Sequence, residues 1–478
     1  MTENGVRQYH AVLETEEEPE EKLLQTAFGE VYIGTLIEKL VLLCTLKYAA
    51  LDPGGRGVEM EGGKPGWYDA LNGLPGLLGS SMAEAYELAR NLYYTISVLR
   101  KYQTDVVLFQ ELADLIGELE TITRKRPEFQ NDSDICLPFW NAVNDAKETY
   151  REQVYRELSG EVTTVSYEKL AAALELFLQV SMEGIQRSLA DGNGLCPTYY
   201  YYEVTDYRED ENGIWPLAML RHEVPAFLEG PVRYLKLPME ITEKQKLYQT
   251  VKESGLYDRK LKMYKVNTWL GDASFELGRA HCFTPGWLEN ESIWLHMEYK
   301  YLLELLKSGL YKEFAEDFHK AAVPFMDPEV YGRSILENSS FIASSCNPDE
   351  RIHGQGFVAR LSGSTIEFLS MWRILMFGKE PFAVKDGELY CELQPCILSY
   401  LLGEEKTIRA KLLNQTLVTY HTDAQDDYFP GHYEISRIEL YDADGKKEEI
   451  SCGTISGETA QAVRSGKIKK LEIYLLKK

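Results

Sequence analysis

Apolar residues recur at helical spacing along most of the chain. Between Leu23 and Leu51 they form a wide stripe, which predicts a helix that is buried on much of its circumference. Later stretches with the same period predict further helices at about 81–102, 105–125, 139–159, 167–190, 242–255, 290–308, 311–323 and 364–377. Because the breaks between these stretches are polar or contain glycine, the antiparallel helical hairpin is the predicted repeating unit.

Two segments depart from this pattern. Residues 191–240 contain five prolines and the run Tyr199 to Tyr202, which predicts an irregular or strand-containing segment. After Gly378, β-branched and aromatic residues cluster between turn signals and predict strands at 388–393, 415–421, 433–441 and 469–476.

The chain has 478 residues, which exceeds the usual size of one hydrophobic core, so more than one domain is expected. We predict a mainly α protein built as an α/α toroid followed by a small β-sandwich-like domain. The predicted parts are an acidic lead-in over residues 1–20, the helical toroid over 21–379 and the β-domain over 380–478.

Composition narrows the classes of function. A formal charge of -24 disfavours nucleic acid and anionic membrane as partners, because such a surface repels phosphate groups. We find no apolar run long enough to span a bilayer and no readable secretory signal. The eight cysteines include no Cys-x-x-Cys pair, which predicts reduced thiols, a cytoplasmic protein and no zinc site.

A glycine-rich loop over residues 52–79 contains the first candidate for chemistry. Asp69 lies two residues after Trp67. This pattern suits a sugar site, where an indole face packs on the ring and an acid reaches the glycosidic oxygen. The alternative is that Asp69 is a turn residue or a helix cap, which is the commoner role of a loop aspartate.

The same stretch resembles the Asp-Trp-Asn-Asp-x-Leu-Asn signature of glycoside hydrolase family 94, the cellobiose and chitobiose phosphorylase family. The matching positions are Trp67, Asp69, Leu71 and Asn72, whereas Gly66 replaces the first Asp and Tyr68 the Asn. The resemblance implies that Asp69 is the general acid and that Trp67 contacts the substrate.

A second segment, residues 286–296, is similar to the Glu-Asn-Gly-Gly-Ile-Phe-x-His run of this family. The resemblance implies that Glu289 and Asn290 bind sugar and that His296 binds phosphate. A spacing of seven residues is about two helical turns, so we expect Glu289 and His296 on one face of a helix. The alternative for His296 is a core histidine bonded to a backbone carbonyl.

A third segment, residues 351–365, looks like the Tyr-Thr-Gly-Ser-Ala loop of the family and implies a phosphate cradle made of Ser362, Gly363 and Ser364. Small hydroxyl residues and glycine at the start of a helix also expose free N–H groups and the positive end of the helix dipole to an anion. Arg360 would add charge, or would pair with a nearby carboxylate.

The three segments occur in the family's order and imply an (α/α)6-type toroid. They also imply inverting phosphorolysis of a β-linked glucosyl disaccharide or oligosaccharide to an α-glycosyl 1-phosphate. Phosphate then takes the place of the activated water, so one protein acid suffices. The implied partners are the oligosaccharide and phosphate as co-substrate, with no metal or organic cofactor.

Family members carry a β-sandwich and opening helices before the acid-bearing loop, whereas here Asp69 follows only one or two predicted helices. This difference predicts an incomplete toroid with an exposed apolar edge along residues 23–51, facing either a second copy or the missing amino-terminal half.

Two other functions stay open on the sequence. One is an inverting hydrolase on the same fold, with Glu289, Glu291 or Glu367 as base. The other is a non-catalytic carbohydrate-binding subunit that uses Tyr199 to Tyr202 as a stacking surface, although ordinary packing is the commoner role of such tyrosines.

Overall fold

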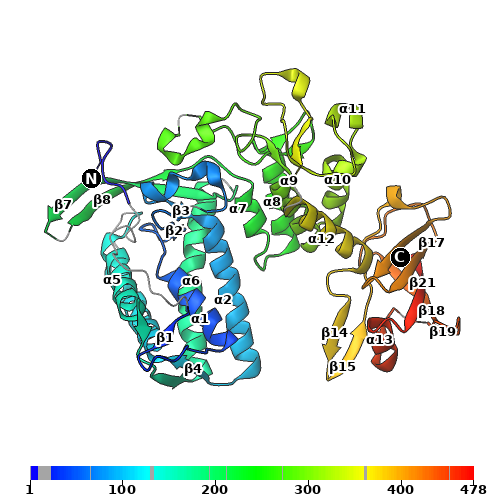
Figure 1. The fold of residues 1–478 in the computed structure, drawn as a ribbon, viewed down its shortest axis with the longest axis horizontal. Helices are drawn as coiled ribbons and strands as arrows, with labels where there is room; N and C mark the ends of the chain where they lie inside the picture. Colours follow the sequence, from blue (N-terminus) through cyan, green and yellow to red (C-terminus); the bar gives the residue numbers. More distant parts are fainter. Residues whose placement is uncertain are drawn as a thin grey trace. The chain divides into compact units, whose positions relative to one another are not determined.

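The computed structural model describes residues 2–8, 23–64, 66–129, 134–192, 194–211, 213–271, 273–359, 363–451 and 453–478 (Figure 1). The chain forms two compact units. The first comprises Met1–Glu298, Val330–Gly332 and Phe341–Phe357, and the second Tyr299–Glu329, Arg333–Ser340 and Val358–Lys478. The predicted boundary at residue 380 falls inside the second unit, and most of the predicted lead-in over residues 1–20 lies outside the described residues.

Eight of the α-helices in the described residues lie wholly within the first unit. Its helices are α1 (Leu36–Tyr48), α2 (Met82–Tyr102), α3 (Gln110–Arg124), α4 (Arg126–Phe129), α5 (Leu137–Val154), α6 (Tyr167–Asp191), α7 (Glu229–Tyr234) and α8 (Ile241–Glu253). The two longest, α2 and α6, lie side by side (Figure 1). Each begins at a serine cap, since Ser81 accepts a hydrogen bond from the Glu84 N–H and Ser166 accepts one from the Lys169 N–H. Both were predicted from periodicity.

The predicted helix over residues 23–51 is wrong in its first half. The helix begins only after the Thr35 cap, whose side chain accepts from the Glu38 N–H. Before it, Gly29 has a φ of 76°, and the short strand β1 (Gln25–Thr26) pairs with β5 (Glu157–Leu158). The burial predicted for this stretch is also wrong at several positions. The exposed apolar edge predicted along residues 23–51 is instead observed, with apolar side chains exposed at Leu23, Leu24, Phe28, Val31, Ile33, Leu36 and Leu43.

The predicted helix at 105–125 likewise starts with a strand. That strand, β4 (Val106–Phe109), pairs antiparallel with β6 (Val162–Val165), and α3 follows it directly. Val106 and Leu108 are buried and Val107 between them is exposed, which is the alternation of a strand. Because all three residues are apolar, the sequence does not show this alternation.

A four-stranded antiparallel sheet positions the glycine-rich loop. Its order is β2 (Val58–Glu59), β3 (Ser80–Ser81), β7 (Tyr199–Asp210) and β8 (Gly213–Glu223). The loop leaves the sheet at β2 and returns at β3. The long β7–β8 hairpin confirms the prediction that residues 191–240 contain strands. Tyr199, Tyr200 and Tyr202 are buried. The run therefore packs into the unit, and the stacking surface expected of a binding subunit is wrong at these three positions.

The second half of the loop is anchored by a hydrophobic cluster. Tyr68, Leu71 and Leu74 pack in this cluster with Phe227 and Leu277. Gly73 is required there, because a Cβ at this position would overlap the Glu276 carbonyl oxygen while the Gly73 N–H donates to the Leu277 carbonyl at 3.1 Å. This packing fixes the loop segment that carries Trp67 and Asp69.

Helix α9 (Leu295–Lys307) begins in the first unit and continues in the second, and several short strands lie on either side of it in the sequence. The short strands are β9 (Tyr257–Asp258), β10 (Met263–Tyr264), β11 (Ile293–Trp294), β12 (Ser339–Ile342) and β13 (Gly356–Ala359). The later helices are α10 (Tyr311–Ala321), α11 (Pro328–Tyr331), α12 (Gly363–Phe377) and α13 (Gly457–Arg464).

The carboxyl-terminal strands confirm the predicted β-rich segment. A five-stranded mixed sheet contains β16 (Thr407–Leu412), β17 (Thr416–Thr422), β21 (Ile468–Lys477), β18 (Tyr433–Asp442) and β19 (Lys447–Ile450) in that order. A smaller sheet contains β14 (Phe382–Lys385), β15 (Glu388–Cys391) and β20 (Ile455–Ser456). The helical hairpins do not by themselves establish a closed ring, so the toroid stays a prediction. No helix within the described ranges is long and apolar enough to cross a membrane.

Candidate functional site

The glycine-rich loop contacts residues 279–296, which run into the start of α9, through three consecutive residues, Trp67, Tyr68 and Asp69. Tyr68 is buried, and its hydroxyl donates a hydrogen bond to the backbone carbonyl of Glu289. Its ring also packs edge-on against Phe227, with ring centroids 5.0 Å apart. Because Tyr68 is held from both sides, the side chains of Trp67 and Asp69 are placed next to the segment around Glu289.

Two carboxylates of this site meet one guanidinium. Arg279 Nη2 lies 3.4 Å from Asp69 Oδ2 and 3.8 Å from Glu289 Oε2. The two oxygens are therefore at most about 7 Å apart, a bound that covers the separation of about 5 to 5.5 Å in retaining glycosidases and the lower end of the range of about 6.5 to 9.5 Å in inverting ones. Asp69 opens a 3-10 turn (Asp69–Leu71), but its carboxylate contacts Arg279 across 210 residues of sequence.

The two carboxylates have different environments. The Asp69 side chain is 69% exposed, whereas that of Glu289 is only 12% exposed. Burial raises the pKa of the Glu289 carboxyl, and the charge of Asp69 raises it further against the opposing effect of Arg279. Glu289 thus keeps its proton to higher pH than an ordinary glutamate does, as a proton donor requires.

Trp67 brings an aromatic face to the same site. Its indole Nε1 donates to Glu229 Oε2 at 2.7 Å, and its ring meets the His296 ring edge-on at 5.6 Å. Trp67 is 39% exposed and lies two residues before Asp69 on the loop. An exposed indole next to paired carboxylates is an arrangement that can pack on a sugar ring.

Glu229 fixes the orientation of this indole and was missed by the sequence analysis. Its buried carboxylate accepts from Trp67, from the Tyr199 hydroxyl at 2.9 Å and from Arg233 at 3.1 Å. Arg279 was missed as well. The sequence signal for Glu229 was its spacing of four residues from Arg233, which is typical of an ion pair on one face of a helix. The segment around Arg279 carries no recognisable motif.

Replacing Glu229 by Ala should lower the free energy of unfolding by about 3 kcal/mol, because it leaves buried donors of Trp67, Tyr199 and Arg233 without their acceptor. Chemical denaturation measures this loss. Glu229→Gln retains one oxygen acceptor and should cost less. Equal losses in the two variants would show that the hydrogen bonds to Glu229 do not hold this site together.

The prediction that Glu289 and His296 share a helical face is wrong. Helix α9 begins at Leu295, so Glu289 lies in the preceding turn. Leu288 and Glu291 have φ values of 49° and 55°, which no α-helix accommodates. The His296 ring instead contacts Trp67, while the backbone carbonyl of Glu289 accepts a hydrogen bond from the next loop residue, Tyr68.

Asn290 is buried, and its Nδ2 donates to the Phe283 carbonyl at 2.9 Å. This contact stabilises the turn, and the sugar contact expected of Asn290 stays a prediction.

The predicted phosphate cradle is divided between the two units. Arg360 and Ser362 lie outside the described residues. Gly363 begins α12 and Ser364 is buried near its start, both in the second unit, whereas His296 belongs to the first. Phosphate binding by these five residues therefore stays a prediction.

The other carboxylates considered as a base have ion-pair partners. Glu291 Oε1 lies 2.7 Å from Lys265 Nζ, with both side chains buried, and Glu367 Oε1 lies 2.7 Å from Lys300 Nζ in the second unit. Within the first unit, Glu289 shares the guanidinium of Arg279 with Asp69, whereas Glu291 pairs with Lys265.

Comparisons with known proteins give no family. No protein-family model and no curated protein matches the sequence. Among solved structures, the chain is similar to an uncharacterized conserved protein from Thermus thermophilus, at 10% identity over 71% of this chain and 92% of that one, with a TM-score of 0.26. It is also similar to a GH63 mannosylglycerate hydrolase from the same organism in complex with glucose, at 11% identity over 70% and 92%, with a TM-score of 0.24. Likeness this weak carries no argument about fold or activity, and membership of glycoside hydrolase family 94 stays a prediction.

Proposed function

We propose that the first unit hydrolyses a glycosidic bond with inversion at the anomeric carbon. The observation that supports this proposal is the approach of Asp69 and Glu289 to the single guanidinium of Arg279, beside the exposed indole of Trp67. In such a site one carboxylic acid protonates the leaving oxygen and a carboxylate on the other face activates water.

The environments of the two groups favour one assignment of roles. Glu289, whose pKa is raised by burial, is the proton donor. The Asp69 carboxylate is exposed to water beside Arg279, so it is the base. This assignment changes the role of Asp69 from the general acid that the sequence resemblance implies to the general base.

Phosphorolysis is the second candidate. It is favoured by Arg279, which is half exposed beside Asp69, and by His296 next to Trp67, because both are groups that can hold an anion. In this version Asp69 is the general acid, Glu289 contacts the sugar, and phosphate attacks the anomeric carbon to give an α-glycosyl 1-phosphate.

A cleavage assay with and without inorganic phosphate separates the candidates. With β-linked gluco-disaccharides as substrates, we expect release of free reducing sugar that does not depend on phosphate. Formation of a sugar 1-phosphate only when phosphate is present would establish phosphorolysis instead, and no cleavage in either condition would favour a binding module.

If phosphate is the acceptor, His296→Ala should weaken its use by about tenfold to a hundredfold, since a hydrogen bond between charged groups contributes about 1.5 to 3 kcal/mol. The matched control is His432→Ala, which removes an imidazole from the second unit. Equal phosphate use by both variants would remove His296 from the phosphate site.

A further inference from the structure

A cavity of about 600 Å³ lies in the first unit, on the early part of the glycine-rich loop. Its walls come from α1, from the loop between Glu59 and Gly66 and from α5. Leu43, Leu46 and Met60 supply apolar surface. Among the described residues, those that line this cavity do not include Asp69, Arg279, Glu289 or His296. The cavity is therefore separate from the site of the proposed function, and its volume is in the range of small-molecule sites.

Three side chains give the cavity a polar centre. Trp140 Nε1 donates to Glu59 Oε1 at 2.8 Å. Lys147 Nζ lies 3.6 Å from Glu59 Oε2 and 3.6 Å from Glu148 Oε1, and its side chain is only 9% exposed. A donor ammonium and an indole N–H thus both lie against one acceptor carboxylate on the cavity wall.

The lining of the cavity contains equal numbers of acidic and basic side chains. Its four acidic side chains are Glu59, Glu61, Glu84 and Glu148, and its four basic ones are Lys47, Lys64, Lys147 and Arg151. The outer charges pair with one another, since Lys47 contacts Glu84 and Arg151 contacts Glu61 and Glu148. A balanced lining favours a neutral ligand over an anion or a cation.

Glu59 differs from an ordinary ion-pair partner. Burial raises the pKa of its carboxyl to about 7, although Lys147 and the Trp140 N–H oppose the rise. The carboxylate of Asp52 is a further charge that raises the pKa of Glu59. Near neutral pH the Glu59 carboxyl is therefore present in both forms, so it can accept a hydrogen bond from a hydroxyl group or donate one to it.

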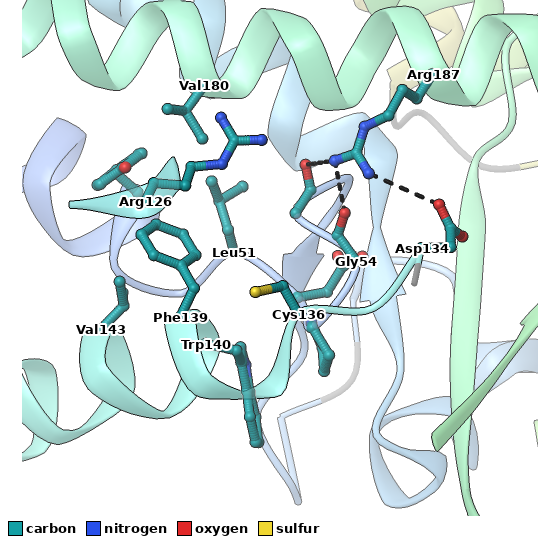
Figure 2. Close-up of a pocket in the computed structure, with 14 residues that line it drawn as sticks. Leu51, Gly54, Arg126, Asp134, Cys136, Phe139, Trp140, Val143, Val180 and Arg187 are labelled. Atoms are coloured by element: carbon teal, nitrogen blue, oxygen red, sulfur yellow. Dashed lines mark hydrogen bonds and ion pairs between the residues drawn. The ribbon is translucent and has the colours of Figure 1, made fainter. Parts of the chain in front are cut away.

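A neighbouring cavity has a different lining. It measures about 140 Å³ and shares Trp140 with the larger one, and its lining includes Arg126 and Arg187 (Figure 2). Arg187 donates to the Gly54 carbonyl at 2.7 Å and lies 3.7 Å from Asp134, and Arg126 donates to Glu183 at 2.5 Å. These arginines already have acceptors, so the larger cavity is the better candidate.

We propose that the larger cavity binds a saccharide, with Glu59 and Lys147 bonding adjacent hydroxyl groups and Trp140 contacting the ring. Sugar hydroxyls both donate and accept, which matches a carboxylate beside an ammonium, and the uncharged ring matches the balanced lining. The cavity includes Gly66, which directly precedes Trp67. The proposal does not need the Asp69 site to be catalytic.

The test uses the full chain labelled with 5-fluorotryptophan and followed by fluorine NMR during titration with cellobiose. The Trp140 and Trp67 signals are assigned by Trp140→Phe and Trp67→Phe. The Trp140 signal reports on the cavity and the Trp67 signal on the site of the proposed function, so the two proposals can fail separately. We expect cellobiose to shift the Trp140 signal.

Glu59→Gln should weaken the Trp140 titration by about tenfold to a hundredfold, as expected for loss of a hydrogen bond to a charged group. The Trp67 signal should respond as before. The matched control, Glu175→Gln, removes an exposed carboxylate paired with Arg100 on the surface of α6 and should change neither titration. If Glu59→Gln does not fold, Leu43→Tyr at an exposed position of the cavity wall should weaken the titration instead.

Three results would overturn the proposal. The first is a Trp140 signal that does not respond to cellobiose, including the case in which the Trp67 signal alone responds. The second is a Trp140 signal that responds to the zwitterion glycine and not to cellobiose, which would indicate an amino-acid site. The third is an unchanged Trp140 titration in folded Glu59→Gln and Leu43→Tyr variants.

Discussion

Replacing Asp69 by Asn should lower the rate of glycosidic cleavage by about 10²- to 10⁴-fold, the usual contribution of a general acid or base. The substitution keeps the size of the side chain but removes its ability to carry a proton, so the loss is expected for either role of Asp69. Initial rates on a β-linked gluco-disaccharide, with and without phosphate, measure it.

The fold should be unaffected by this substitution. The Asp69 side chain is mostly exposed, and its contact with Arg279 is a surface ion pair of the kind that contributes about 0 to 1 kcal/mol. Asp349→Asn is the matched control, because Asp349 also pairs with an exposed arginine, Arg351. Wild-type rates in Asp69→Asn, or an equal loss in Asp349→Asn, would show that the reacting carboxylate lies elsewhere.

The spacing of apolar residues predicted the helices that are determined by their own sequence rather than by pairing with a distant segment. Helices α2 and α6 follow an amphipathic pattern that starts at a serine cap, and both were predicted closely. The segment from Leu23 to Ile33 has the same apolar content, but Gly29 and the pairing of β1 with β5 break the helix there. That pairing joins residues more than a hundred positions apart, so no local pattern reveals it.

The sequence singled out several residues of the candidate site but not the contacts that join them. Trp67, Asp69, Glu289 and His296 were singled out from three short segments, and the structure brings them together within the first unit. The link between them is made by Tyr68 and Arg279, through one hydrogen bond to a backbone carbonyl and one guanidinium shared by two carboxylates. Such links depend on tertiary contacts, which spacing along the chain does not encode.

The assignment of Glu289 as proton donor leads to the second prediction with a large effect. Glu289→Gln should lower the cleavage rate by about 10²- to 10⁴-fold, because glutamine has nearly the same shape but no proton to transfer. In the wild type, burial and the charge of Asp69 raise the pKa of Glu289, so the rate should stay high up to that raised pKa and fall as pH rises through it. The residual activity of Glu289→Gln should lack this alkaline decline.

The pH profile separates the two roles that Glu289 can have. If Glu289 only contacts sugar hydroxyls, as phosphorolysis implies, glutamine retains an oxygen acceptor, and the change should appear mainly as a higher KM with the alkaline decline intact. Arg279→Gln is an independent check, because Arg279 opposes the rise in the pKa of Glu289. Its removal should move the alkaline decline to higher pH if Glu289 is the donor. A decline at the same pH in Arg279→Gln and in the wild type would assign the proton to another group.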